Sequence, residues 1–411
     1  MDTTLTPQSG TRPTLAVLFV GAFAMGSADM LVVGMLDLIS TDLAVSVPRA
    51  GTLVTAFALG MAIGGPVLAL LTAHLDRRSV LIGAVAAFVL LNLVPVLVPG
   101  YTLFLLARAG AGAVEGLFIA AALTAVDGIV PKDRSGRAMG LVITGFATAS
   151  ALGLPLGTLA GQVLGWRASF AALVGIALVV LIVSVRVLPS VPTARESRTA
   201  CAQLRNALAP RVLAVLAVCC LVFAGVQSAL TYLVPYLTEV TEVSGTTVVV
   251  LLCAFGVSTT VGSAAGARFA DVHAARTLVC GTCGLTAVLA TMYLFGGHAV
   301  VAVLTIVGLG LFAMGMAPAL QSRVMCLAGP GAALAASLPA SAANAGDSVG
   351  ALLGGVAINQ AGVAAAVLAG AVVTAAAVAV AVATSPLRPA ESAQDTSPTE
   401  VTVPDAERIA A

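Results

Sequence analysis

Long apolar runs, separated by short polar segments, recur along the whole chain. A run of about 18 residues is long enough to cross a bilayer as one helix. Runs of this length lie near residues 14–40, 50–73, 79–98, 101–126, 138–164, 168–188, 212–238, 245–270, 277–297, 299–322, 332–360 and 363–384. The pattern therefore predicts twelve transmembrane helices. Only two polar segments are long, residues 189–211 and residues 385–411.

The composition agrees with a membrane environment. Of the 411 residues, 59% are apolar and 9% are charged, and the mean hydropathy is +1.08. A soluble domain carries roughly 25% charged residues. The chain is therefore predicted to be an all-α, multi-pass membrane protein. Its net charge of +1 provides no field that would attract nucleic acid.

The distribution of basic residues predicts the orientation, because cytoplasmic loops are enriched in Lys and Arg. With the N-terminus inside, the outer loops hold only Arg49 and Arg167, and Arg108 lies within a span. The other basic residues fall in inner segments: Arg12, Arg77, Arg78, Lys132, Arg134, Arg137, Arg186, Arg195, Arg198, Arg205, Arg211, Arg268, Arg276, Arg323, Arg388 and Arg408. We expect a protein of the cell membrane with both termini in the cytoplasm.

The chain divides into two halves that repeat each other. We expect a cytoplasmic N-terminus (1–13), a six-helix bundle (14–188), a cytoplasmic linker (189–211), a second six-helix bundle (212–384) and a disordered cytoplasmic tail (385–411). Asp76 and Asp271 occupy matching loops of the two halves. Glycines at every fourth residue, which let helices approach closely, recur in span five (Gly153, Gly157, Gly161) and span eleven (Gly346, Gly350, Gly354). Such six-helix repeats are typical of secondary transporters.

Buried charges mark the candidate chemistry. Asp29 lies near the middle of the first span, where a carboxylate is costly and by default marks a proton or transport pathway. Arg108 and Glu115 are seven residues apart on span four, which places them on one helix face about 10 Å apart. We expect these three residues to share a polar cavity and couple transport to protons; the alternative for Arg108 and Glu115 is a static ion pair. Asp37 is interpreted as a solvated helix end.

Five local patterns resemble the major facilitator superfamily, and in particular its twelve-span drug/proton antiporters. They are Asp29-Met-Leu-Val-Val-Gly34, Asp76-Arg77-Arg78 after span two, Arg108-Ala-Gly-Ala-Gly112 in span four, Pro131-Lys-Asp-Arg-Ser-Gly-Arg137 after span four, and Gly153-Leu-Pro155-Leu-Gly157 with Gly161 in span five. The chain departs from these motifs at Thr72, Ala267 and Ala111, and it has Gly21 where some multidrug relatives carry a second acid. Within the branch, the chloramphenicol-resistance and sugar-exporter group is the most similar.

The resemblance implies the major facilitator fold, with two pseudo-symmetric bundles and alternating access. It also implies that spans one, four, seven and ten line the substrate cavity. We expect Gln227, Tyr232 and Tyr236 to contribute polar groups from span seven. Asn344 and Asp347 are cavity candidates in span eleven, with a side-chain-to-backbone hydrogen bond as the alternative for Asp347. Asp76, Arg77 and Arg78, with Asp271 in the second half, would form a gating loop, and the Gly153–Gly161 stripe with Pro155 the antiporter helix motif.

The resulting expectation is proton-coupled efflux of a small, neutral amphipathic drug similar to chloramphenicol. An exporter of a sugar, nucleoside or other metabolite is the alternative, and a non-transporting scaffold or receptor is a third. No Gly-Lys-Ser/Thr phosphate loop occurs, so the proton gradient, without a cofactor, would drive transport. Cys280 and Cys283 lack a second pair to complete a metal site. We expect no metal, no enzymatic activity and a functional monomer in the lipid bilayer, with protons and a small molecule as its partners.

Overall fold

The computed structural model describes residues 11–190 and 208–387. Most of the expected acidic tail, of the expected linker and of the expected N-terminal segment lies outside these residues. The described parts are helical and contain no strand. The predicted all-α fold is thereby confirmed.

The first half begins with a broken span, α1 (Thr11–Gly34) followed by α2 (Leu36–Asp42). The remaining helices of this half are α3 (Val47–Leu59), α4 (Gly65–Leu71), α5 (Arg77–Leu97), α6 (Tyr101–Ile129), α7 (Lys132–Thr148), α8 (Leu154–Leu164) and α9 (Trp166–Val187). Short π-helical turns join α3 to α4 (Gly60–Gly64) and α7 to α8 (Ala149–Gly153).

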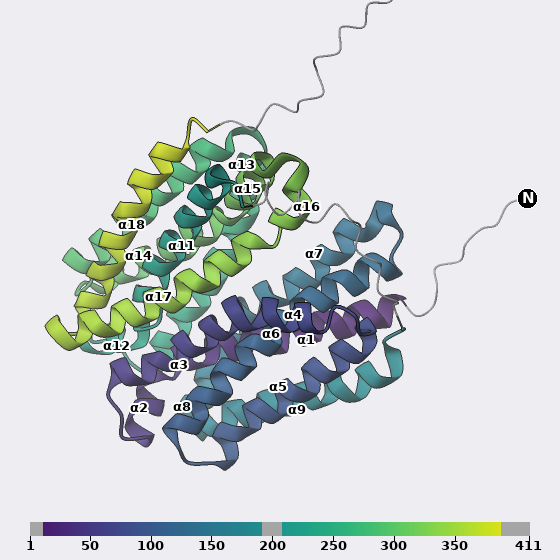
Figure 1. Ribbon diagram of the computed structural model, residues 1–411. Helices are drawn as coiled ribbons and strands as arrows, with labels where there is room; N and C mark the ends of the chain where they lie inside the picture. The colour runs from purple at the N-terminus through teal and green to yellow at the C-terminus, as the bar shows by residue number, and fades with distance from the viewer. Residues whose placement is uncertain (1–10, 191–207, 388–411) are drawn as a thin grey trace, which may run out of the picture.

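The second half begins in the same way, with α11 (Pro210–Leu230) followed by α12 (Leu233–Glu239). The other helices are α13 (Thr246–Phe295), α14 (Ala299–Gly315), α15 (Ala317–Ala328), α16 (Ala332–Ala335), α17 (Leu338–Ala361) and α18 (Ala364–Thr384). Helix α13 holds two predicted spans, and they meet at His273, whose φ of −144° and ψ of 54° are not helical. Figure 1 shows the two halves as separate bundles that meet along α17 and α3.

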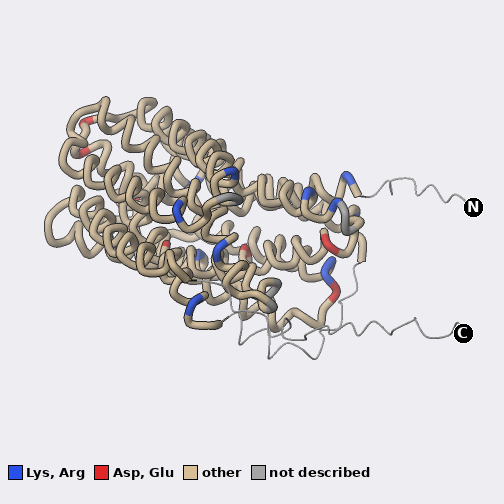
Figure 2. The backbone as a smooth tube through the Cα atoms, turned by 90° about the horizontal axis from the view of Figure 1, so that it is seen from above, with Lys and Arg blue, Asp and Glu red and all other residues tan. Residues whose placement is uncertain are grey.

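Eleven spans of the described chain are long and apolar enough to cross a membrane. The remaining predicted span, span eleven at 332–360, corresponds to α17, which has 24 residues but carries Asn344, Asp347 and other polar groups. These groups lower its hydropathy without shortening it. Figure 2 shows how little of the chain is charged.

The first span of each half is broken, which corrects the prediction of one continuous helix at 14–40 and at 212–238. Met35 and Tyr232 depart from helical geometry in the same way, with φ and ψ of −128° and 21° and of −108° and 19°. Pro235 explains the second break, because a proline ring clashes with the carbonyl four residues earlier, here that of Thr231. At the first break, Gly34 has low helix propensity.

The two π turns have a similar origin. Each ends just before a proline, Pro66 or Pro155, whose missing N–H removes a helical hydrogen bond. The wider turn forms a bond across five residues instead: the Gly65 N–H donates to Gly60 O, and the Leu154 N–H donates to Ala149 O. Spans two and five therefore pass their prolines without ending.

We call the end of the molecule at which α1 begins the terminal end, and the opposite end the far end. At the terminal end, the Thr14 hydroxyl donates to Val187 O of α9. In the second half, Arg211 at the start of α11 donates to Leu327 O at the end of α15. These bonds align the helix ends within each half.

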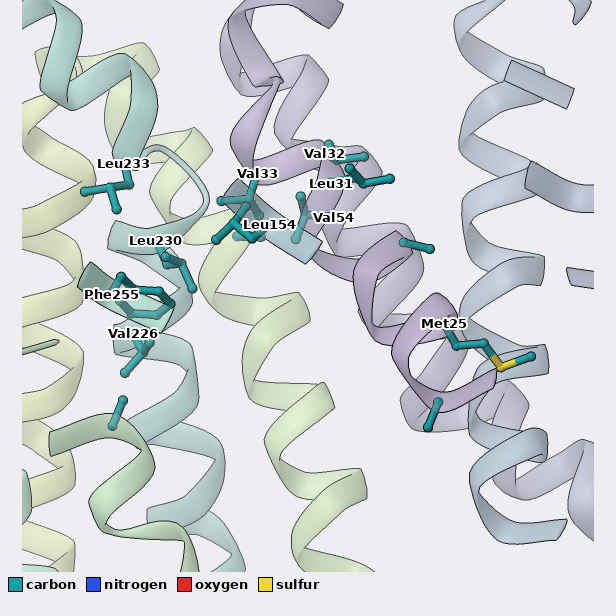
Figure 3. Close-up of a cluster of buried hydrophobic side chains, with 14 of the residues drawn as sticks. Met25, Leu31, Val32, Val33, Val54, Leu154, Val226, Leu230, Leu233 and Phe255 are labelled. Atoms are coloured by element: carbon teal, nitrogen blue, oxygen red, sulfur yellow. The ribbon is translucent and has the colours of Figure 1, made fainter. Parts of the chain in front are cut away.

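The two halves are in contact at the far end and diverge toward the terminal end. Helix α17 packs along α3 and the first π turn and hardly along α4. Similarly, α13 packs on α8 and the second π turn and hardly on α7. Buried apolar side chains of one cluster cross this boundary, and Figure 3 shows Val33 and Leu154 of the first half with Leu230 and Phe255 of the second. Contact between the halves is thus concentrated at the far end.

Candidate functional site

Arg108 is a buried charged side chain that is anchored to two neighbouring helices. It lies on α6 with only 1% of its surface exposed. Its guanidinium donates to Ala28 O at 2.7 Å, to Asp29 O at 3.3 Å and to Leu53 O at 3.4 Å, and it lies 4.0 Å from the centre of the Phe57 ring. The guanidinium thus connects α6 to the backbones of α1 and α3. Such charge-assisted bonds and cation–π contacts are strong in a desolvated site.

Glu115 lies on the same helix and is also 1% exposed. Its Oε2 atom is buried and has no hydrogen-bond partner among the described residues. It lies within electrostatic range of Asp29 and Arg108, but no ion pair joins it to Arg108. The alternative of a static ion pair is therefore not what the structure shows. A buried carboxylate without a partner is costly to hold in its charged form.

Asp29 completes the predicted cluster. Its side chain is only partly buried, and it interacts electrostatically with Arg108 and Glu115. Because Arg108 bonds the backbone carbonyl of Asp29 rather than its carboxylate, the carboxylate stays available. The structure thus brings together the three residues that the sequence nominates for proton coupling. Their role in coupling stays a prediction.

Asp347 approaches the cluster from the other half. It lies on α17, is partly buried, and is close enough to Asp29 for the two carboxylates to interact. Its neighbour Gly346 allows the close approach of α17 to α11, since a Cβ there would come within 2.3 Å of Cys220 O. No hydrogen bond joins the Asp347 side chain to the described backbone. Asn344, in contrast, donates to Ala340 O in its own helix.

The span-seven candidates are placed differently from the expectation. Gln227, Tyr232 and Tyr236 are at most 4% exposed. The hydroxyl of Tyr232 donates to Ala351 O at 2.9 Å, and that of Tyr236 donates to Met292 O at 2.6 Å. In this conformation both tyrosines hold helices together, and their contact with substrate stays a prediction.

The predicted gating loop lies at the terminal end. Asp76 precedes α5 and accepts hydrogen bonds from the Ser79 N–H at 3.4 Å and from the Ser190 hydroxyl at 2.9 Å. Arg78 donates to Val185 O of α9, whereas Nε of Arg77 is buried without a partner. Asp76 therefore caps a helix N-terminus, where a carboxylate is favourable. The Asp271 side chain lies outside the described part of the structure.

The glycine stripes permit the close helix packing that their spacing predicts. A Cβ at Gly153 or Gly157 would lie 2.2 Å from Ser27 or 2.0 Å from Leu31 of α1, and one at Gly161 would lie 2.2 Å from Met35 at the break in the first span. In the second half, a Cβ at Gly350 would lie 2.1 Å from Ala224 O of α11. Each stripe therefore seats a helix against the first span of its own half.

Two features of the site, the Phe57 ring and the carbonyl partners of Arg108, could not be predicted from the sequence. Phe57, under the Arg108 guanidinium, is one of many phenylalanines in apolar runs. The carbonyl partners of Arg108 are backbone atoms, which any residue could supply. Cys280 and Cys283 are exposed free thiols, and no group of metal-ligating residues occurs in the part of the chain that the structure describes.

Two six-helix halves with a buried charged cluster are typical of helical membrane transporters. The sequence matches the Major Facilitator Superfamily over residues 18–337, and the chain belongs to this family. The family that the sequence motifs predicted is thereby confirmed. The protein is a transporter, not an enzyme.

Similar proteins support the same assignment. The chain is 32% identical to the chloramphenicol resistance protein of Streptomyces lividans, covering 81% of this chain and 86% of the relative. It is 30% identical to the MFS-type transporter YtbD of Bacillus subtilis, covering 77% and 80%. Among solved structures, a bacterial homologue of the lysosomal transporter Spinster superposes with a TM-score of 0.82 at 15% identity, covering 92% of this chain and 98% of that one.

Proposed function

We propose that the protein exports a small, neutral amphipathic drug in exchange for protons across the cell membrane. The observation that carries this proposal is the carboxyl group of Glu115, buried without a hydrogen-bond partner and close to Asp29. A group that is costly to ionise in one conformation and solvated in another can bind and release a proton as the conformation changes.

We propose that the terminal end faces the cytoplasm, because the basic residues gather in its segments and cytoplasmic loops are enriched in Lys and Arg. The divergence of the halves toward that end supports an inward-open state with a cleft between them. The drug would enter the cleft from the cytoplasm or the inner leaflet. We expect one chain to perform the whole cycle, driven by the proton gradient without a cofactor.

The exchange step uses the shared electrostatics of the cluster. Drug binding near Asp29 and Glu115 would displace the proton that the two acids hold between them, because coupled acids titrate as a pair. The halves would then rock, open the cleft to the outside and release the drug as the acids are protonated again. Arg108 stays charged throughout, held by backbone carbonyls, and compensates the acid that has lost its proton.

The choice of substrate rests on two observations. A relative at 32% identity is named as a chloramphenicol resistance protein, and only 4% of the residues are aromatic, which argues against a pocket for flat polyaromatic cations. A sugar exporter is the second candidate, because the chain is 29% identical over 316 residues to a probable sugar efflux transporter of Mannheimia succiniciproducens.

A susceptibility panel in an efflux-deficient host tests the function. We expect the wild-type chain to raise tolerance to chloramphenicol, and a protonophore to abolish the gain. The Glu115→Gln variant, expressed to the same level, should lose the gain. Tolerance that survives the protonophore would refute proton coupling. Relief of sugar toxicity without any drug tolerance would favour the second candidate.

A further inference from the structure

Two carboxylates lie within electrostatic range of each other at the boundary between the halves at the far end. Asp37 lies in the first turn of α2, and Glu239 is the last residue of α12. Each short helix follows the break in the first span of its half, and the two pack against each other. The broken spans thus place one acid from each half at this contact between α2 and α12, which we call the seam.

The pair lacks a neutralising cation. Neither carboxylate forms an ion pair or hydrogen bond with another described residue, although Asp37 is partly buried and Glu239 is exposed. Other charged or titratable groups occur on α1, α2, α3 and α12. Arg12 lies at the start of α1, at the terminal end, and Asp29 lies two turns from Asp37 on the same span. Asp42 pairs with Arg167 at 2.6 Å, Arg49 lies over the Tyr101 ring, and Tyr236 donates to Met292 O.

Protonation relieves the repulsion in this seam. Partial burial and the nearby Glu239 charge raise the pKa of Asp37 from 3.8 to about 6. When the seam opens, water surrounds Asp37 and Glu239 moves away, so its pKa falls toward the ordinary value. The closed seam therefore binds the proton more tightly than the open one. Protonation favours closure below about pH 6, and this advantage is lost as the pH rises through that value.

We propose that Asp37 and Glu239 form a second proton-binding site, at the outer seam, which holds the transporter closed on the outside when the two acids share one proton. The proposal rests on the alternating access and orientation of the proposed function, but not on its substrate. The outside is the acidic side of an energised membrane. A proton taken from outside would close the seam after drug release and return the empty carrier to its inward-open state.

The test measures the seam directly in the full-length chain. Nitroxide labels at Thr41→Cys and Ser244→Cys, in a background without the seven native cysteines, report the distance across the seam in phosphatidylglycerol/phosphatidylethanolamine nanodiscs. We expect the short distance at pH 5 and a growing long-distance population up to pH 8. The closed-to-open ratio should change by at most about 100-fold, since the pKa differs by about two units between the states.

Variants of the two acids test whether they are the groups that bind the proton. Asp37→Asn and Glu239→Gln should each keep the seam closed at pH 8 and flatten the pH profile, because one charge of the pair is gone. Asp42→Asn is the matched control, since this acid lies on the same helix but pairs with Arg167; its profile should follow the parent. Hydrogen exchange of α2 with the native cysteines present provides a second readout, in which protection should fall with rising pH.

A pH profile that Asp37→Asn and Glu239→Gln leave unchanged would overturn the proposal. Because no drug is present in this measurement, that failure leaves the proposed function standing if Asp29→Asn still abolishes proton-coupled efflux. Conversely, if drug efflux proves not to be coupled to protons, the pH dependence of the distance across the seam should still depend on Asp37.

Discussion

The two halves share one architecture but differ in where they carry charge. In the first half, α6 holds Arg108 and Glu115 beside Asp29 of α1. Its counterpart in the second half, α14, contains no charged residue. Among the described residues of the second half, Asp347 on α17 is the acid that approaches the cluster. The comparison indicates that the two repeats keep the same helix packing while the buried charged cluster lies mainly in the first.

In the packing of the glycine stripes, the second half is the more constrained of the two. The glycines of α8 meet side chains of α1, such as Leu31, whereas those of α17 meet backbone carbonyls of α11, such as Ala224 O. A side chain can move aside, but a backbone cannot. The second half is therefore expected to tolerate changes at its glycine stripe less well than the first.

Replacing Arg108 should have the largest effect. Arg108→Ala leaves three carbonyls without their donor, at a cost on the order of 3 kcal/mol in the free energy of unfolding, and should abolish transport. Arg167→Ala is the control: this exposed arginine pairs with Asp42, and its loss should cost at most about 1 kcal/mol. Thermal unfolding and drug efflux would show both effects. Equal destabilisation by the two variants would contradict the anchoring role of Arg108.

The glycine stripes allow a direct comparison of the halves. Gly350→Ala would place a Cβ 2.1 Å from Ala224 O and should cost about 1–3 kcal/mol by overpacking. Gly157→Ala meets the end of Leu31 and should cost less. Gly175→Ala, with nothing within 4 Å, serves as the control and should be neutral or slightly stabilising. Thermal unfolding of the three variants should follow this order, and the reverse order would refute the difference between the halves.

Phe57 should have the smallest effect on stability and a selective effect on transport. Phe57→Leu removes the ring under Arg108, a contact of about 1 kcal/mol, and should lower efflux several-fold. Phe88→Leu is matched, because both side chains are fully buried and Phe88 does not contact Arg108. An efflux rate that falls equally in both variants would show that the ring only fills space.

The sequence predicted the fold well because apolar runs and basic loops depend on the bilayer, which acts on every span in the same way. The family was predictable because Asp29, Arg108 and the Gly153 stripe are local motifs. The breaks at Met35 and Tyr232 were missed, since hydropathy does not register a change of backbone angles. Pro235 was a signal for the second break, because a proline inside a span displaces a carbonyl.

The site was only partly predictable. The residues of the cluster were found because a charge in a membrane span is rare. Their partners could not be, because Arg108 bonds backbone carbonyls that no residue type marks. Tyr232 and Tyr236 appeared in the sequence as polar groups for a cavity, but their hydroxyls bond neighbouring helices. Asp37 was interpreted as a solvated end, and its pairing with Glu239 depends on contact between the halves.

Substrate-induced proton movement in proteoliposomes tests the central claim, that proton coupling resides in the first half. The assay uses the drug that the susceptibility panel identifies and compares Asp29→Asn with Asp347→Asn. We predict that Asp29→Asn abolishes proton movement while drug binding persists, and that Asp347→Asn retains it. Wild-type proton movement in Asp29→Asn would contradict the account.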